Sequence, residues 1–158
     1  MAAVHHIYAQ AVLEGTATFE IIPPSVAEMA GRRAAILAHP GPYLVAVGEG
    51  AVLGFAYAGS FRSRPAFNFT VENTVYVAPP ALRRGVGLAL TLGLIERCTA
   101  MGYRQMIAVI GGDNAASVAL HARAGFVPAG VLKNVGRKFD RWLDVTLMQR
   151  ELASPDQK

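Results

Sequence analysis

The sequence predicts an α/β (α+β) domain with a mixed, mostly antiparallel twisted sheet and helices on both faces. Its 158 residues, 53% of them hydrophobic and 16% charged, are typical of one globular domain with a buried core. A β-hairpin pattern surrounds Glu49 and Gly50. A strand, a glycine-rich loop, a helix and a second strand follow one another between residues 70 and 111. This order indicates a parallel crossover within the sheet.

Two helices are expected before the first strand. Apolar residues recur at helical spacing from Val4 to Val12, and the pattern ends at Gly15. Ser25, with Glu28 three residues later, has the form of a capping box. We therefore predict a second helix that runs towards His39 and ends at the Pro-Gly-Pro segment that follows.

Strands and helices alternate in the rest of the chain. The strand that begins near residue 70 ends at a Pro-Pro pair, and Gly102 and Gly125 stand where C-cap glycines belong. The expected elements are two strands within 43–58, a strand at 70–78, a helix at 86–101, a strand at 104–110, a helix at 115–124, and strands near 126–135 and 142–150.

The composition argues against nucleic acid as a partner. Fifteen basic and 11 acidic residues give a net charge of +4. The arginines come in pairs beside Gly or Pro, Arg62 with Arg64 and Arg83 with Arg84, without the basic and aromatic stripes of nucleic-acid binders. We expect small anionic ligands instead.

The same composition argues for a cytoplasmic protein without a membrane segment or a metal. No stretch reaches the roughly 20 apolar residues of a membrane helix, and no basic lead precedes an apolar segment at the N-terminus. Cys98 is the single cysteine, and it falls on the apolar face of a predicted helix, where we expect it in the core. His5 and His6 are adjacent rather than four residues apart, so they do not predict a metal site.

The loop LRRGVG, residues 82–87, lies between a predicted strand and a predicted helix. Its glycines let the backbone approach a ligand, and the helix N-terminus offers free amide groups to a phosphate. It lacks the Gly-Lys-Ser/Thr of a Walker loop and the third glycine of a dinucleotide fingerprint. Taken alone, the loop could equally be a structural turn.

Two motifs in the C-terminal half resemble a known superfamily. VYVAPPALRRGVGLAL and, one strand later, NAASVALHARAGF resemble the GCN5-related N-acetyltransferases (GNAT), whose acetyl-CoA motif has the form (Q/R)xxGx(G/A). TATFEIIPPSVAEM, FRSRPAFNFTVENTVYV and VGRKFDRWLDVTLMQ resemble the phosphinothricin and methionine sulfone acetyltransferase branch, so the resemblance covers nearly the whole chain. It implies a single N-acetyltransferase domain over 1–158 with the GNAT fold, acetyl-CoA as co-substrate and no metal.

Two departures from the family pattern are visible. Leu82 stands where the motif usually has Gln or Arg, which removes one side-chain contact and leaves Arg83 and Arg84 to compensate. Relatives begin with a strand, whereas this chain starts almost inside its first helix. We therefore expect the sheet to lack that edge strand.

The resemblance also implies a cofactor site. Backbone groups of Val75, Tyr76 and Val77 would hold the pantetheine arm of acetyl-CoA as if it were an added strand. Asn114 would bond the pantetheine region, with Ser117 in the same site, although Asn114 is equally well placed as an N-cap. The pyrophosphate would be held by the loop residues Arg83, Arg84, Gly85, Val86, Gly87 and Leu88.

Acetyl transfer to an amine needs a base, an oxyanion contact and an acid. The resemblance implies that Glu72 takes the proton of the amine, directly or through water. A strand amide, Val75 or Val77, would meet the oxyanion, and His121 would protonate the leaving thiolate. The alternatives are a solvent-facing strand glutamate for Glu72 and a buried structural histidine for His121.

The acceptor site is implied by the loop FRSRP. Arg62 and Arg64 flank Ser63, and in an extended segment both would face one side, as a carboxylate requires. A solvated arginine pair is the alternative. The further acceptor residues implied by the resemblance are Phe19, Glu20, Glu72, Asn73 and Thr74, with Trp142 nearby.

Together these features predict an acetyl-CoA-dependent N-acetyltransferase that acts on the α-amino group of a small amino-acid-like acceptor. Phosphinothricin, methionine sulfone and methionine sulfoximine are acceptors of that type. The alternatives are acetylation of protein N-termini and a non-catalytic acyl-CoA-binding regulatory module. The resemblance further implies a homodimer with its sites near the interface.

Overall fold

A computed structural model describes residues 1–39 and 41–152. The helices are α1 (Ala2–Glu14), α2 (Val26–Ala38), α3 (Val86–Ala100) and α4 (Ala115–Arg123). The strands are β1 (Tyr43–Gly48), β2 (Ala51–Ser60), β3 (Thr70–Val77), β4 (Gln105–Gly111), β5 (Val127–Lys138) and β6 (Arg141–Glu151). Short 3₁₀ helices at Pro65–Phe67 and Pro79–Ala81 flank β3. Pro40, the first residue of the expected helix stop, lies outside the described residues.

The six strands form one sheet in the order β1-β2-β3-β4-β6-β5. Only the neighbours β3 and β4 run parallel, joined by the crossover through α3, and the other four pairs are antiparallel. The predicted fold class and the parallel crossover are therefore confirmed. In the described part of the chain no strand precedes α1, so β1 is an edge of the sheet, as expected.

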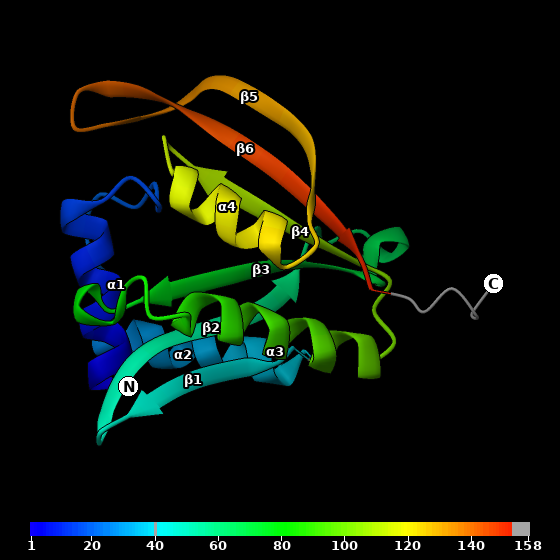
Figure 1. The fold of residues 1–158 in the computed structure, drawn as a ribbon, viewed down its shortest axis with the longest axis horizontal. Coiled ribbons are helices and arrows are strands. Elements are labelled where there is room, and N and C mark those ends of the chain that lie inside the picture. The colour runs from blue at the N-terminus through cyan, green and yellow to red at the C-terminus, as the bar shows by residue number, and fades with distance from the viewer. Residues whose placement is uncertain (40, 153–158) are drawn as a thin grey trace.

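Helices cover the two faces of the sheet unequally (Figure 1). On one face α1 and α2 pack on β1, β2 and β3 around a core that contains Val12, Met29 and Phe55. On the other face α3 and α4 cover a larger core that contains Leu94 and Met106. The strands β4, β6 and β5 therefore receive helices on one face only.

The last hairpin is longer than its sequence pattern predicted. The pattern suggested strands near 126–135 and 142–150, whereas β5 extends to Lys138 and β6 begins at Arg141. The two-residue turn between them, Phe139 and Asp140, has φ of 51° and 56°. Left-handed backbone at both turn positions matches the twist of a hairpin, and such turns usually contain Asn-Gly or another glycine. The Phe139–Asp140 pair contains no glycine, so the sequence did not predict a turn here.

Local predictions for α2 and α3 hold in the structure. The Ser25 hydroxyl caps α2 by accepting from the Glu28 N–H at 3.1 Å. The Glu28 carboxylate does not complete the capping box by accepting from the Ser25 N–H, because it pairs with Arg32 at 2.7 Å. Cys98 is fully buried in the core beneath α3. Burial raises the pKa of its thiol to about 12, so it is an unreactive core residue.

The strands β3 and β4 pair over only part of their length. Their parallel register begins at Thr70 and Gln105 and ends at Asn73 and Ala108. Beyond this point β3 stays paired with β2, and β4 stays paired with β6 through Gly111. The two strands therefore separate towards their C-terminal ends, as Figure 1 shows. We call this space the strand gap.

Alternation along β3 determines which backbone groups face the strand gap. Ala78 N–H donates to Leu53 O on the β2 side at 2.9 Å, whereas Phe69 O accepts from Arg104 N–H on the β4 side at 2.8 Å. Successive residues of a strand turn their N–H and C=O groups to opposite sides. The groups of Val75 and Val77 therefore point into the strand gap, while those of Tyr76 belong to the ladder with β2.

Within residues 1–39 and 41–152, no helix is long and apolar enough to cross a membrane. The same residues contain no cluster of three His, Cys, Asp or Glu side chains arranged for a metal ion. The His5 ring instead hydrogen-bonds the Pro24 carbonyl oxygen through Nε2 at 2.8 Å, so it joins α1 to the segment before α2.

Candidate active site

Two adjoining cavities meet at the strand gap. The inner cavity, about 230 Å³, reaches from α1 and β2 across the gap to α4. The outer cavity, about 560 Å³, lies between β3, the glycine-rich loop and the start of α3 and α4. They share the wall residues Ala17, Val75, Tyr76, Asn114 and Ser117. A long ligand can thus occupy both, with its middle portion against β3.

The loop before α3 is shaped to hold an anion at the outer cavity. Arg83 and Gly85 both have left-handed backbone, with φ of 59° and 81°. Consecutive turns of this kind gather N–H groups into a concave nest. The first N–H to bond within the helix is that of Ala89, which donates to Gly85 O at 3.0 Å. The preceding amides, of Val86, Gly87 and Leu88, therefore remain open at the positive end of the helix.

Most residues expected at the cofactor site line the outer cavity. The predicted wall residues are Val75, Tyr76, Val77, Arg83, Gly85, Val86, Gly87, Leu88, Asn114 and Ser117. Leu82 lines the same cavity, while Arg84 is exposed and outside its wall. Arg123, at the end of α4, also contributes to the wall. It lies within the motif NAASVALHARAGF, although that motif predicted no role for it. It is a second positively charged residue in the wall that contains Arg83.

Asn114 acts as the N-cap of α4. Its Oδ1 accepts from the Ser117 N–H at 3.0 Å, which confirms the capping role expected from its position. Because Asn114 also lines both cavities, this cap fixes α4 directly at their junction. The predicted contact with pantetheine remains a prediction.

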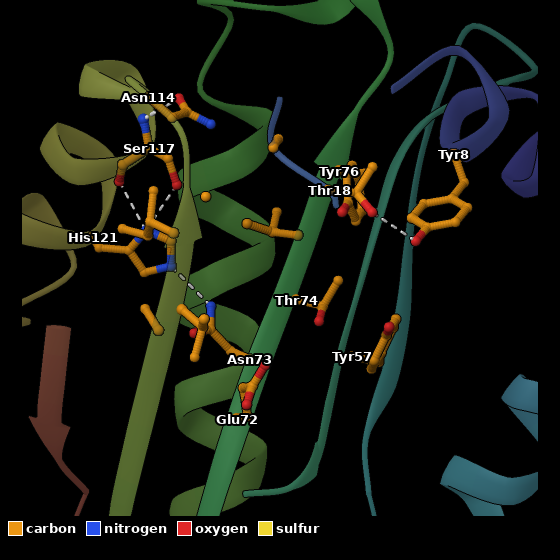
Figure 2. A pocket seen from close by; sticks show the side chains of 16 residues that line it. Tyr8, Thr18, Tyr57, Glu72, Asn73, Thr74, Tyr76, Asn114, Ser117 and His121 are labelled. Carbon is orange, nitrogen blue, oxygen red and sulfur yellow. Dashed lines mark hydrogen bonds between the residues drawn. The ribbon is translucent and has the colours of Figure 1, made fainter. Parts of the chain in front are cut away.

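On the α1 side of β3, Glu72, Thr74 and Tyr76 contribute to the wall of the inner cavity (Figure 2). Burial raises the pKa of Glu72, and the positive charge of Arg62 opposes that rise. The Tyr76 ring meets the Tyr8 ring edge-on at 5.0 Å between centroids. Tyr57 completes this aromatic wall. A half-buried carboxylate with a raised pKa accepts a proton more readily than an exposed one.

On the α4 side, His121 is 3% exposed and both ring nitrogens have partners. Nδ1 lies 2.8 Å from the Ser117 carbonyl oxygen, which can only accept, so Nδ1 carries the proton. Nε2 lies 2.9 Å from Asn73 Nδ2 and therefore accepts from that amide. Burial lowers the pKa of His121, partly offset by the Ser117 carbonyl. The resting imidazole is consequently neutral.

The segment after α1 closes one end of the inner cavity. Thr18 Oγ1 lies 3.1 Å from the Tyr8 hydroxyl, and the buried Lys138 Nζ donates to Thr18 O at 2.9 Å. The Phe19 ring fits against two glycines: a Cβ at Gly111 would lie 2.8 Å from Phe19 Cε1, and one at Gly136 would overlap the same ring. The glycines therefore create the slot that seats this segment.

Phe19 and Glu20 thus hold the segment rather than line either cavity. The Glu20 carboxylate pairs with Arg32 of α2 at 2.6 Å. The wall instead includes Tyr8, Ala17, Thr18 and Tyr57, which sequence reasoning did not identify. The helical apolar pattern of α1 pointed to Tyr8 only as a core residue, and a tyrosine hydroxyl facing a threonine is visible only in three dimensions.

Arg62, Ser63 and Arg64 are exposed and lie outside both cavity walls. The segment bends rather than extends, and the Arg62 guanidinium stacks on the Phe61 ring at 4.3 Å. Arg62 is still close enough to Glu72 to affect its pKa. Trp142 is 65% exposed at the start of β6 and also lies outside the cavity walls.

The sequence and the fold match known proteins. Residues 6–126 match the Acetyltransferase (GNAT) family. The chain is 52% identical over 155 residues to a phosphinothricin N-acetyltransferase of Alcaligenes faecalis, covering 98% of this chain and 79% of the relative. It is 42% identical over 147 residues to an L-methionine sulfoximine/L-methionine sulfone acetyltransferase of Pseudomonas paraeruginosa, covering 92% and 86%.

A solved structure has the same fold as this chain and a related sequence. The phosphinothricin acetyltransferase of Sinorhizobium meliloti, determined in complex with acetyl-CoA, has a TM-score of 0.94 and 49% identity, covering 98% of this chain and 84% of that one. The family predicted from the two C-terminal motifs is therefore confirmed. The chain belongs to the GNAT family of acetyltransferases.

Proposed function

We propose that this enzyme transfers the acetyl group of acetyl-CoA to the α-amino group of a small amino-acid-like acceptor, of the phosphinothricin, methionine sulfone or methionine sulfoximine type. The observation that carries the proposal is the junction of the two cavities at the strand gap, with Glu72 in the wall of the inner one. The relatives that act on such acceptors match over nearly the whole chain. The acetyltransferase domain accordingly spans residues 1–158.

The outer cavity fits acetyl-CoA. The open amides of Val86, Gly87 and Leu88, with Arg83 and Arg123, suit the pyrophosphate. The backbone groups of Val75 and Val77 would pair with the pantetheine amides as a missing strand would. This arrangement brings the thioester to the junction of the two cavities and leaves the inner cavity to the acceptor.

Glu72 is the proposed general base. The α-amino group has a pKa of about 8, so near neutral pH it must lose a proton before it attacks. The raised pKa of Glu72 makes the carboxylate a better proton acceptor than an exposed glutamate. The amine nitrogen then bonds to the thioester carbon, and a strand-gap amide of Val75 or Val77 stabilises the oxyanion.

His121 is the proposed source of the proton for the leaving thiolate. When the tetrahedral intermediate breaks down, the C–S bond cleaves, its electron pair stays on sulfur, and sulfur takes up one proton. The resting imidazole holds its proton on Nδ1, against Ser117 O. A proton released by the acceptor amine must therefore reach Nε2 before His121 can act as the acid.

The exposed apolar surface of the last hairpin supports a homodimer. Val131, Val135, Phe139 and Trp142 are each at least half exposed on β5, β6 and their turn. Apolar patches of this kind are typical of contacts with another protein. We propose that a second copy of the chain covers them.

We also propose that the enzyme works in the cytoplasm, where its single cysteine thiol stays reduced.

Gly85→Glu is expected to abolish acetyl-CoA binding. The new carboxylate would repel the pyrophosphate, and a side chain is strained at the φ of 81°. Gly102→Glu is the matched control, because Gly102 has a φ of 85° at the opposite end of α3. In calorimetric titration Gly102→Glu should bind normally. Unchanged affinity in a folded Gly85→Glu variant would remove this loop from the site.

Glu72→Gln is expected to retain acetyl-CoA binding and to lower kcat near neutral pH by about 10²- to 10⁴-fold. The parent rate should rise with pH as Glu72 ionises, through a pKa above the ordinary glutamate value. The variant should lack this rise and recover partly at high pH, where the amine is free. Glu96→Gln, on the exposed face of α3, is the control. A pH profile of Glu72→Gln that matched the parent's would exclude Glu72 as the base.

Arg62 and Arg64 lie outside the cavity walls, but Arg62 is close enough to Glu72 to oppose the rise of its pKa, and we propose that both arginines turn towards the carboxylate of a bound acceptor. Arg62→Ala and Arg64→Ala are then expected to raise KM for a free amino-acid acceptor and to leave KM for acetyl-CoA unchanged. A guanidinium pair gains most from a carboxylate and is left unpaired by a neutral analogue. The assay compares the free acid with its methyl ester and with a peptide, and Arg97→Ala is the distant control. Equal use of acid and ester would contradict the carboxylate contact, and preference for peptides would favour acetylation of protein N-termini. Absence of transfer to any amine, with acetyl-CoA bound, would favour the regulatory module.

Val131→Glu is expected to convert the dimer to a monomer in sedimentation equilibrium. A buried unpaired charge at an interface costs several kcal/mol. Val47→Glu makes the same change on the exposed edge strand β1 and should remain dimeric. A parent protein that sediments as a 16.8 kDa monomer at micromolar concentration would contradict the proposal.

A further inference from the structure

The hydrogen bonds of Asn73 are unbalanced. The residue is 6% exposed, and its Nδ2 donates to His121 Nε2 at 2.9 Å. Its Oδ1 is a buried side-chain atom without a hydrogen-bond partner in the described part of the chain. Leaving a buried acceptor unpaired is costly, so such an atom calls for an explanation.

The position of Asn73 suggests the explanation. It is the last residue of β3 that pairs with β4, at the point where the strand gap opens. In Figure 2 its side chain points at the His121 ring, and Ser117 lies on the other side of that ring. Asn73, Ser117 and His121 all line the inner cavity. The unpaired oxygen therefore belongs to the side chain that contacts Nε2 of His121, the ring nitrogen that can gain a proton.

We propose that Asn73 is a positioning residue whose side-chain amide turns over when His121 takes up a proton on Nε2. A half-turn about the last side-chain bond exchanges Nδ2 and Oδ1. The amide N–H faces the bare nitrogen of the neutral ring, and Oδ1 faces the N–H of the imidazolium. Each orientation leaves one amide atom unpaired, so the turn costs no additional hydrogen bond.

No other group around His121 is placed to stabilise a positive charge at Nε2, so Asn73 Oδ1 is the acceptor for the imidazolium in the described part of the chain. On its own helix it faces Ser117, whose carbonyl oxygen already holds Nδ1–H. The Phe126 ring stands perpendicular to it at 5.0 Å between centroids. Neither group ionises. Glu72, the neighbour of Asn73, points to the opposite face of β3 by strand alternation.

The amide turn gives the catalytic cycle a place for one proton. Glu72 takes the first proton of the amine before the attack, and the nitrogen of the tetrahedral intermediate then loses a second one. That N–H bond breaks and its proton forms a bond to Nε2, while Oδ1 accepts from the new N–H. When the C–S bond has cleaved, the proton passes to the thiolate and the amide turns back. This use of the turn rests on the proposed acetyl-transfer function, whereas the turn itself is a property of the free protein.

The wild-type protein provides the first test, by nitrogen-15 NMR of the His121 ring, assigned with a His121→Gln variant. Above the pKa of His121 we expect a protonated Nδ1, a bare Nε2, and a scalar coupling between Nε2 and Asn73 Nδ2 across the hydrogen bond. On acidification Nε2 should gain a proton and this coupling should vanish. A resting tautomer with the proton on Nε2, or a coupling that persists below the pKa, would overturn the proposal.

Asn73→Asp and Asn73→Leu test the same idea by substitution. The aspartate can only accept, so it should hold the proton on Nε2 and raise the pKa of His121. The leucine can neither donate to Nε2 nor accept from Nε2–H. It should therefore lower the pKa of His121 and reduce kcat by about 10- to 100-fold without changing KM for acetyl-CoA. Gln149→Glu, an exposed amide-to-acid change on β6, should alter nothing.

The outcomes separate the two proposals. The expected NMR behaviour without any acetyl transfer would leave the amide turn standing and refute the enzymatic function. Acetyl transfer with an unchanged His121 pKa in Asn73→Asp would refute the amide turn alone. A kcat in Asn73→Leu equal to the parent's would refute the proton route through His121.

Discussion

Backbone amides and carbonyls that leave a sheet need other partners, and this requirement organises the whole molecule around the strand gap. The β3–β4 register ends at Asn73 and Ala108, and from there the alternation of β3 turns the groups of Val75 and Val77 towards an open space. The loop before α3 and the N-cap of α4 end at the same space, each with unpaired or locally capped backbone. The proposed ligand, which is extended, carries amides and has an anionic end, would satisfy all of these groups together.

The strand β3 separates the side chains that face α1 and β2 from the side chain that contacts His121 on α4. Its even-numbered side chains, Glu72 and Thr74, face the aromatic wall of α1 and β2, while Asn73 faces His121. The proposed base Glu72 and Asn73, which contacts the proposed acid His121, are adjacent along β3 and therefore lie on opposite faces of the strand. Burial raises the pKa of Glu72 and lowers that of His121, so both groups are shifted towards neutral forms in the resting protein.

The sequence predicted the parts of the structure that depend on neighbouring residues. The Ser25 cap, the turn at Glu49 and Gly50, and the glycine loop before α3 all depend on residues within a few positions of each other. The contacts that shape the acceptor side do not: Lys138 holds Thr18 across 120 residues of sequence. No periodicity or turn rule connects such positions, so Tyr8, Thr18 and Tyr57 were identified only from the fold. Arg123 was likewise identified only from the fold, since its place in the cavity wall depends on how α4 packs beside α3.

The central claim is that the strand gap receives acetyl-CoA as a replacement for the missing β3–β4 pairing. Hydrogen exchange of single backbone amides, measured by NMR with and without acetyl-CoA, tests it directly. Binding should slow the exchange of the Val75 and Val77 amides and leave that of Tyr76, already paired with β2, unchanged. If acetyl-CoA binds and the Val75 and Val77 amides exchange as fast as before, the ligand does not lie along β3 and the account is wrong.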